Sequence, residues 1–190
     1  MILSNTDILK AIRKKRIIID PLPGPDQFSP SALDLRVGSQ FLKWKTDQRG
    51  AELHFDLSTV NIPSYKDYIE PVKPESDGRI KLLGNDFILA ITLEKIRLTY
   101  TSRLAARVEG RSSYARLGLQ VHMTAPTVHC GFEGPIVLEL KNCGRHPLMI
   151  TPEHTCLCQL IFEEVKSQPY GAFQTVFLNQ LDPLGCRKKK

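Results

Sequence analysis

The run 107–118, RVEGRSSYARLG, holds three arginines, two serines and two glycines. A strand pattern ends at Gly110, where the chain can turn tightly, and residues 111–113 then open a short predicted helix. The N–H groups at the start of a helix bind anions, and arginine adds charge-assisted hydrogen bonds. Arg111 and Arg116 therefore make this run a candidate phosphate site. The alternative is a serine that caps the helix beside two solvated arginines, and the residue types alone favour that alternative slightly.

One acidic residue, Glu139, interrupts the apolar run 136–140, IVLEL. A carboxyl group that points into the protein loses solvation, which favours its protonated form and suits it to proton transfer near neutral pH. A glutamate on the wet face of a half-buried strand has no such role, and periodicity alone favours this second interpretation. Glu139 is thus a candidate general acid and base whose assignment depends on the direction of its side chain.

Histidine and cysteine side chains raise the question of a metal site. The stretch 121–134, VHMTAPTVHCGFEG, is typical of a strand, a turn and a glycine-flanked loop, and it holds two histidines. Cys156, Cys158 and the nearby His154 form a second group. A single residue between two cysteines is poor spacing for tetrahedral zinc, and no second cysteine pair completes such a site. We therefore expect no metal centre, with the cysteines buried in a strand.

These candidates need a scaffold that positions them. Ser4 and Asp7 predict the start of a helix, because apolar residues follow at helical spacing. Further along, short apolar runs separated by Gly, Pro and Asn predict an all-β sandwich or barrel. Strands are expected at 17–19, 32–37, 39–57, 87–92, 105–108, 136–140, 148–150 and 156–162, with an irregular excursion at 58–80 and a helix at about 112–118. A chain of 190 residues predicts one domain, 1–190.

The net charge of +6 is unevenly distributed. Residues 187–190 are all basic, and the rest of the chain has 22 Lys and Arg against 20 Asp and Glu, so the body is nearly neutral. Aromatic residues do not alternate with basic clusters, as a groove for single-stranded nucleic acid requires, so no nucleic-acid partner is expected. No apolar run approaches the roughly 20 residues of a membrane span, and no signal peptide is evident. The five cysteines are an odd number, which favours reduced thiols and a cytoplasmic protein.

Several of these stretches together resemble the dCTP deaminase family of the dUTPase-like superfamily. The resemblance rests on RVEGRSSYARLGL (107–119), VHMTA, GFEGPIVLEL, SALDLRVG (31–38), DFILAITLE (86–94) and the first 20 residues, and it runs in order over residues 1–165. It implies a mainly β fold, a distorted jelly-roll β-barrel, assembled as a homotrimer with active sites between subunits. It also implies hydrolytic deamination of dCTP to dUTP and ammonia, which supplies dUTP and dTTP synthesis.

The resemblance implies roles for individual residues. Glu139 is expected to act as general acid and base, taking a proton from water and delivering protons to N3 and the leaving amine of cytosine. Ser112 and the carbonyl group of Ala125 would orient that water, and Arg116 would fix the charge of the site. The residues expected to bind the nucleotide are Arg111, Ser112, Ser113, Thr127, Val128, His129, Gln159 and Tyr170.

Cofactors and ligands follow from the same resemblance. The family uses no catalytic metal, and this sequence lacks the H-x-E and P-C-x-x-C signature of the zinc deaminases. Mg²⁺ is expected only with the nucleotide triphosphate. The expected ligands are dCTP and dUTP, with dTTP as a candidate inhibitor.

Departures from the family pattern leave alternatives open. His129 stands where the family usually has the aspartate that contacts the 3′-hydroxyl and, in dUTP-cleaving relatives, activates water; Thr127 stands where some members have arginine. An imidazole can bond a hydroxyl but replaces an ionised carboxylate base poorly, so dUTP cleavage is not expected. The C-terminal lid of the family matches only at Tyr170, which makes 166–190 an atypical lid with a basic tail. An active dCTP deaminase is the leading hypothesis; the alternatives are a non-catalytic nucleotide-binding member and a bifunctional enzyme that also cleaves dUTP.

Overall fold

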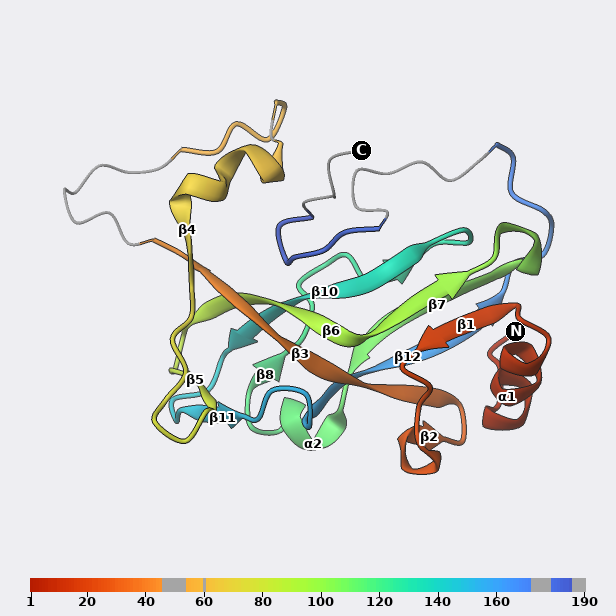
Figure 1. Ribbon diagram of the computed structural model, residues 1–190, viewed down its shortest axis with the longest axis horizontal. Helices are drawn as coiled ribbons and strands as arrows, with labels where there is room; N and C mark the ends of the chain where they lie inside the picture. Colours follow the sequence, from red (N-terminus) through yellow and green to blue (C-terminus); the bar gives the residue numbers. More distant parts are fainter. Residues whose placement is uncertain (46–53, 60, 172–178, 186–190) are drawn as a thin grey trace.

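The computed structural model describes residues 1–45, 54–59, 61–171 and 179–185. Its main feature is a ten-stranded antiparallel sheet that curls around the core (Figure 1). The strands are β1 (Ile17–Asp20), β2 (Phe28–Ser29), β3 (Ala32–Trp44), β4 (Ile69–Pro71), β5 (Ile80–Leu82), β6 (Phe87–Leu98), β7 (Leu104–Gly110), β8 (Leu119–Gln120), β9 (Thr127–Val128), β10 (Glu133–Asn142), β11 (Leu148–Ile150) and β12 (Cys156–Glu164). The main path runs β8–β10–β6–β3–β12–β7–β9, with β1, β2 and β4 paired alongside, and β5 and β11 form a second, small sheet.

The sheet curls because β3 changes partners along its length. Residues 33–36 of β3 pair with β12, whereas residues 37–42 pair with β6 and residues 42–44 with β4. A shift of register between Val37 and Phe41 accompanies the change, and such irregularities bend strands and increase their twist. The β12–β7–β9 half and the β6–β10–β8 half therefore enclose one core. Leu138 of β10 and Phe162 of β12 are both fully buried in it.

Helices are few and short. They are α1 (Asn5–Arg13), α2 (Ser112–Ala115) and the 3₁₀ turns η1 (Pro25–Gln27), η2 (Ile62–Tyr68) and η3 (Tyr100–Ser102). The predicted start of α1 is confirmed, because the Oγ of Ser4 accepts a hydrogen bond from the Asp7 N–H at 3.2 Å. Ile8 then packs in the core with no exposed surface.

The prediction for residues 39–80 was wrong in part. Strands with a polar turn around 47–50 were expected over 39–57. The first of them is the end of β3, which reaches Trp44, but no strand is present at 54–57; residues 46–53, which include the expected turn, lie outside the described residues. The excursion at 58–80 was expected to be irregular, but it contains η2 and β4. β4 forms because it adds to the edge of β3, a long-range pairing that local periodicity does not show.

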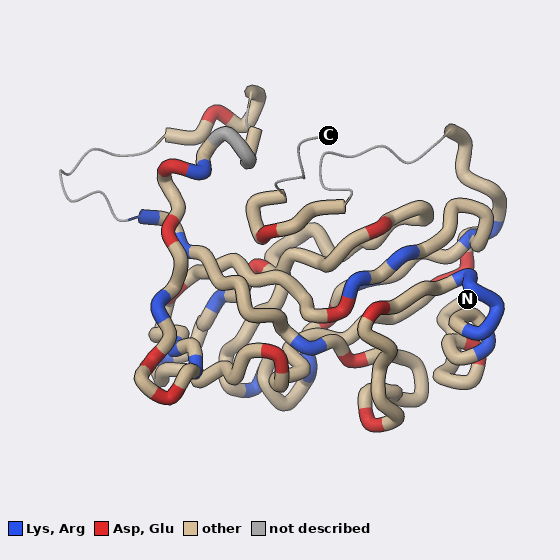
Figure 2. Tube along the Cα trace, in the orientation of Figure 1, with Lys and Arg blue, Asp and Glu red and all other residues tan. Residues whose placement is uncertain are grey.

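Charged residues of both signs are interspersed along the chain (Figure 2). The longest basic run in the described residues is RKKR at 13–16, at the end of α1. In the described part of the chain, no helix is long and apolar enough to cross a membrane.

Candidate active site

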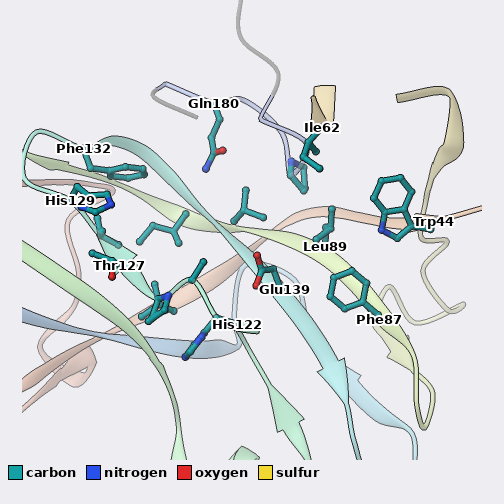
Figure 3. A pocket seen from close by; sticks show the side chains of 17 residues that line it. Trp44, Ile62, Phe87, Leu89, His122, Thr127, His129, Phe132, Glu139 and Gln180 are labelled. Atoms are coloured by element: carbon teal, nitrogen blue, oxygen red, sulfur yellow. The ribbon is translucent and has the colours of Figure 1, made fainter. Parts of the chain in front are cut away.

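A cavity of about 630 Å³ lies on the outer side of β10 and β6 (Figure 3). Its lining comes from the two strands, from the segment 122–132, from the C-terminal segment, defined as residues 179–185, and from single residues of β3, η2 and β7 (Trp44, Ile62 and Val108). Phe87, Leu89 and Trp44 make one wall apolar, and His129 with Phe132 lies at the other side. A concave, mostly apolar cavity with a few polar groups is the usual form of a small-molecule site.

Glu139 points into this cavity from the middle of β10 (Figure 3). Its backbone N–H donates to the carbonyl oxygen of Val121 at 3.1 Å, and its Oε2 accepts the N–H of Met123 at 2.8 Å. Glu139 is half-buried, and its immediate neighbours on the strand, Leu138 and Leu140, have no exposed surface. The carboxylate is therefore held by the main chain of the adjoining segment, with one oxygen directed away from that bond.

Four of the residues expected to serve catalysis or binding line the same cavity: Ala125, Thr127, Val128 and His129. Thr127 and Val128 form β9, which pairs with Arg107 and Ala106 of β7 and thereby fixes this wall. Val128 is buried, whereas the other three are exposed at the rim. The structure thus brings Glu139 and the 125–129 segment together within one chain.

Two buried polar atoms on the cavity wall have no hydrogen-bond partner among the described residues: Nδ1 of His122 and Oε1 of Gln180. Gln180 is 4% exposed, and its Nε2 donates to the carbonyl oxygen of Pro135 at 2.8 Å. Buried polar atoms are nearly always paired, so these two are exceptions on the wall of the cavity. No local pattern in the sequence predicts Gln180 as a site residue, because its position depends on the C-terminal segment folding back over β10.

The other group of expected residues is the arginine turn, defined as residues 111–116. Arg111 is half-buried and lies 3.4 Å from the carboxylate of Asp34, while Ser112, Ser113 and Arg116 are exposed. None of these four is among the described residues that line the cavity. One chain therefore holds Glu139 and the arginine turn in separate places.

The structure corrects the account of helix α2. A helix was expected over 112–118, but α2 has four residues and ends at Ala115. Its N-cap is Arg111, and no side chain caps it, so the alternative with a capping serine is wrong. A single turn has little macrodipole, so any anion affinity must come from the arginine and serine side chains.

Close backbone packing shortens α2. Gly118 has a φ of +93°, and a Cβ at this position would lie 2.5 Å from the backbone nitrogen of Gly144. The N–H of Cys143 donates to the carbonyl oxygen of Gly118 at 2.8 Å. The end of the arginine turn is therefore fixed against the end of β10.

Gln159 and Tyr170 lie outside the cavity. The Nε2 of Gln159 donates to the carbonyl oxygen of Gly110 at 3.1 Å, directly before the arginine turn. The side chain of Tyr170 is fully exposed, and the neighbouring carbonyl of Pro169 accepts the hydroxyl of Tyr100. Gln159 thus lies beside the arginine turn, whereas Tyr170 contacts neither the cavity nor the arginine turn.

The four cysteines among the described residues are free thiols, and Cys158 is fully buried in β12. Burial raises the pKa of the Cys158 thiol and, to a lesser extent, that of Cys156. Both thiols are therefore protonated at neutral pH. Within the described ranges, no three His, Cys, Asp or Glu side chains form a group that could hold a metal ion.

The curled antiparallel sheet, with Glu139 in a cavity on its outer side, defines a mainly β protein with a small-molecule site. The comparisons identify its family. The family model described as dCTP deaminase-like matches residues 2–165. "dCTP deaminase, dUMP-forming" of Methanosphaera stadtmanae is 38% identical over 90% of this chain and 84% of its own length. "dCTP deaminase" of Rhodospirillum rubrum is 36% identical over 98% of this chain and 96% of its own length. The chain belongs to the dCTP deaminase-like family.

The fold also agrees with a solved structure. The 2′-deoxycytidine 5′-triphosphate deaminase from Agrobacterium tumefaciens matches with a TM-score of 0.63 at 20% identity, over 86% of this chain and 48% of that longer chain. The predicted mainly β, distorted jelly-roll fold is confirmed. The single domain over 1–190 stays a prediction, since the family model ends at residue 165.

Proposed function

We propose that this protein is a dCTP deaminase, which hydrolyses dCTP to dUTP and ammonia. The observation that carries the proposal is the Glu139 carboxylate, which the main chain of Met123 holds inside a nucleotide-sized cavity. The names of the relatives, at 36–38% identity over most of the chain, support the same substrate. A non-catalytic member would not need a carboxylate held in this way.

In the proposed mechanism, Glu139 works as general base and then as general acid. The N–H of Met123 fixes Oε2, which leaves Oε1 to take a proton from water as the water attacks C4 of cytosine. The carboxyl passes this first proton to N3, then takes the proton of the hydroxyl group formed at C4 and delivers it to the amine, which leaves as ammonia while the C4 carbonyl forms. The carbonyl oxygen of Ala125, at the rim of the cavity, would orient the water.

The arginine turn would act on the nucleotide of another copy of the chain. Ser112, Ser113, Arg111 and Arg116 do not line the cavity of their own chain, so a site that uses both groups is completed by a partner. Cyclic symmetry makes every copy give one turn and receive one, which agrees with the proposed homotrimer. Arginine and serine would bind the phosphates, and Mg²⁺ would arrive on the triphosphate as part of the substrate.

We propose that the reaction stops at dUTP, because position 129 is a histidine at the rim of the cavity. An imidazole can donate or accept one hydrogen bond with the sugar but does not provide a permanently ionised carboxylate. The second candidate is a dUMP-forming enzyme, which the printed name of the Methanosphaera stadtmanae relative favours. Assay of pyrophosphate and dUMP in the same reaction distinguishes the two.

The test is incubation of the purified protein with dCTP and Mg²⁺, followed by ammonia release and the absorbance change from cytosine to uracil. We expect turnover in the wild type and its loss in Glu139→Gln, with the oligomeric mass unchanged by light scattering. A wild-type protein that binds dCTP without releasing ammonia would contradict the proposal.

A further inference from the structure

A buried carboxylate lies directly under the arginine turn. Asp34, on β3, is 6% exposed, and its Oδ2 is 3.4 Å from Nη2 of Arg111. Two strand pairings connect the two elements: Asp34 is opposite Gln159 of β12, and Gln159 is opposite Glu109 of β7, two residues before Arg111. These strand pairings therefore determine where the Asp34 carboxylate contacts the arginine turn.

Three contacts fix the guanidinium of Arg111. Besides the contact with Asp34, Nη1 donates to the carbonyl oxygen of Cys156 at 3.3 Å, and the group lies 5.6 Å from the ring centre of Tyr114. A guanidinium has five N–H donors in a planar fork. The ion pair through Nη2 and the hydrogen bond from Nη1 leave Nε–H and further N–H donors of this fork for an anion.

The other cationic side chain nearby on β3, Arg36, already forms an ion pair with Glu94. Arg36 donates from Nε to Oε1 of Glu94 at 2.8 Å and from its backbone N–H to Oε2 at 2.8 Å. Glu94 has no exposed surface, so this pair belongs to the interior. In the described parts of the chain, Arg111 is the one cationic side chain that forms an ion pair with Asp34.

Burial makes the pair hard to separate. Loss of solvation raises the pKa of Asp34, and the charge of Arg111 opposes this shift. If Arg111 moved away to follow a phosphate, Asp34 would be a buried charge without a partner, which is strongly unfavourable. Arg111 is therefore expected to remain on Asp34 while it binds, in a direction set before the ligand arrives.

We propose that Asp34 is a positioning residue: it orients Arg111 so that the free side of the guanidinium meets the substrate phosphates. This inference rests on the proposed function. Asp34 does not touch the substrate, and its effect passes through Arg111 alone. The arginine turn is only four helical residues long and exposed, so a fixed arginine lowers the ordering cost of phosphate binding.

The test is a double-mutant cycle on the complete protein, with Asp34→Asn, Arg111→Gln and the double variant. Steady-state kcat and KM for Mg²⁺-bound dCTP are measured for each. We expect Asp34→Asn to raise KM about tenfold, with kcat within about twofold. The double variant should be no worse than Arg111→Gln, because Asp34 has no other route to the ligand. Effects that multiply, or a KM unchanged in Asp34→Asn, would overturn the proposal.

Two further variants separate positioning from a general effect on the fold. Asp77→Asn removes a matched aspartate from the exposed ion pair with Arg79, 2.6 Å apart, and should leave KM unchanged. Asp34→Glu keeps the negative charge and should recover part of the affinity; it also replaces Asp34→Asn should that variant not fold. An Asp34→Glu variant that folds and binds no better than Arg111→Gln would contradict the proposal.

A binding measurement keeps this inference distinct from the proposed function. Tripolyphosphate has no base or sugar, and its affinity is measured by calorimetry for the same variants. A wild type that does not deaminate dCTP would refute the proposed function, yet weaker tripolyphosphate binding in Asp34→Asn would still support the role of Asp34. Equal tripolyphosphate affinity in the wild type and Asp34→Asn would refute the role of Asp34 whatever the activity.

Discussion

The Glu139 cavity and the arginine turn are built in opposite ways. Glu139 stands in the middle of a ten-residue strand, and a main-chain N–H at 2.8 Å holds its carboxylate. The arginine turn contains one helical turn with four exposed residues, and its Arg111 is held by contacts with Asp34, the carbonyl oxygen of Cys156 and Tyr114. The difference teaches that the proposed reacting group is held by a strand and a main-chain N–H, whereas the proposed anion-binding group is held through the contacts of one side chain.

The largest expected effect is that of Glu139→Gln. An amide cannot take a proton from water, so kcat should fall by about 10³-fold or more, while the KM for dCTP changes little. Ammonia release under saturating dCTP measures this loss. The matched control is Glu163→Gln, which removes a carboxylate paired with Arg107 at 2.9 Å on β12 and should keep full activity. Equal loss in both variants would mean that Glu139 has no special role.

A complementation experiment tests whether the two regions act across copies. Glu139→Gln and Arg116→Ala are each expected to be inactive alone. When they are co-expressed, a site that takes Glu139 from one copy and Arg116 from the next is intact in roughly a quarter of cases. Activity near a quarter of the wild type confirms shared sites. No recovery in mixed oligomers, verified by two affinity tags, would place both groups in one chain.

Replacement of Gln180 tests the wall of the cavity. Gln180→Met keeps the length of the side chain and removes both the unpaired Oε1 and the Nε2 bond to Pro135. If a ligand bonds Oε1, KM should rise about fivefold, the value of one hydrogen bond. Gln40→Met is the control, because Gln40 donates to the carbonyl oxygen of Leu181 at 3.2 Å and holds the same segment from outside. A similar rise in both variants would indicate loosening of the segment in place of lost ligand contact.

The smallest expected effect is on stability. Burial raises the pKa of Asp34 above its ordinary value of 3.8, so the folded protein binds this proton more tightly than the unfolded chain. That contribution is present below the ordinary pKa and is lost as the pH rises through the raised one. The Tm of Asp34→Asn should therefore rise relative to that of the wild type as the pH increases from below 3.8 to neutral. A difference in Tm between Asp34→Asn and the wild type that becomes smaller over this pH range would contradict the direction of the pKa shift.

Local sequence signals predicted the parts of this fold that local interactions decide. The capping pair at Ser4 located α1, and the apolar runs located most long strands. Periodicity favours the less buried face of β10 for Glu139, and burial does alternate in this way from Ile136 to Asn142. The cavity on that face could not be predicted, because segments distant in the sequence build it. The length of α2 was also not predicted, because backbone packing of Gly118 on Gly144 ends the helix. The place of Gln180 likewise depends on long-range packing, since only the folded chain brings it to Pro135.

The strand that carries Glu139, β10, should resist local unfolding. β10 pairs with β6 along most of its length and with β8 at its end, so its amide hydrogens should exchange with solvent only in near-global unfolding. Among the described residues, the C-terminal segment adds two hydrogen bonds to the start of β10, from the Asn179 N–H to the carbonyl oxygen of Glu133 and from Gln180 to that of Pro135. Loss of these two bonds would therefore leave intact the strand that carries Glu139.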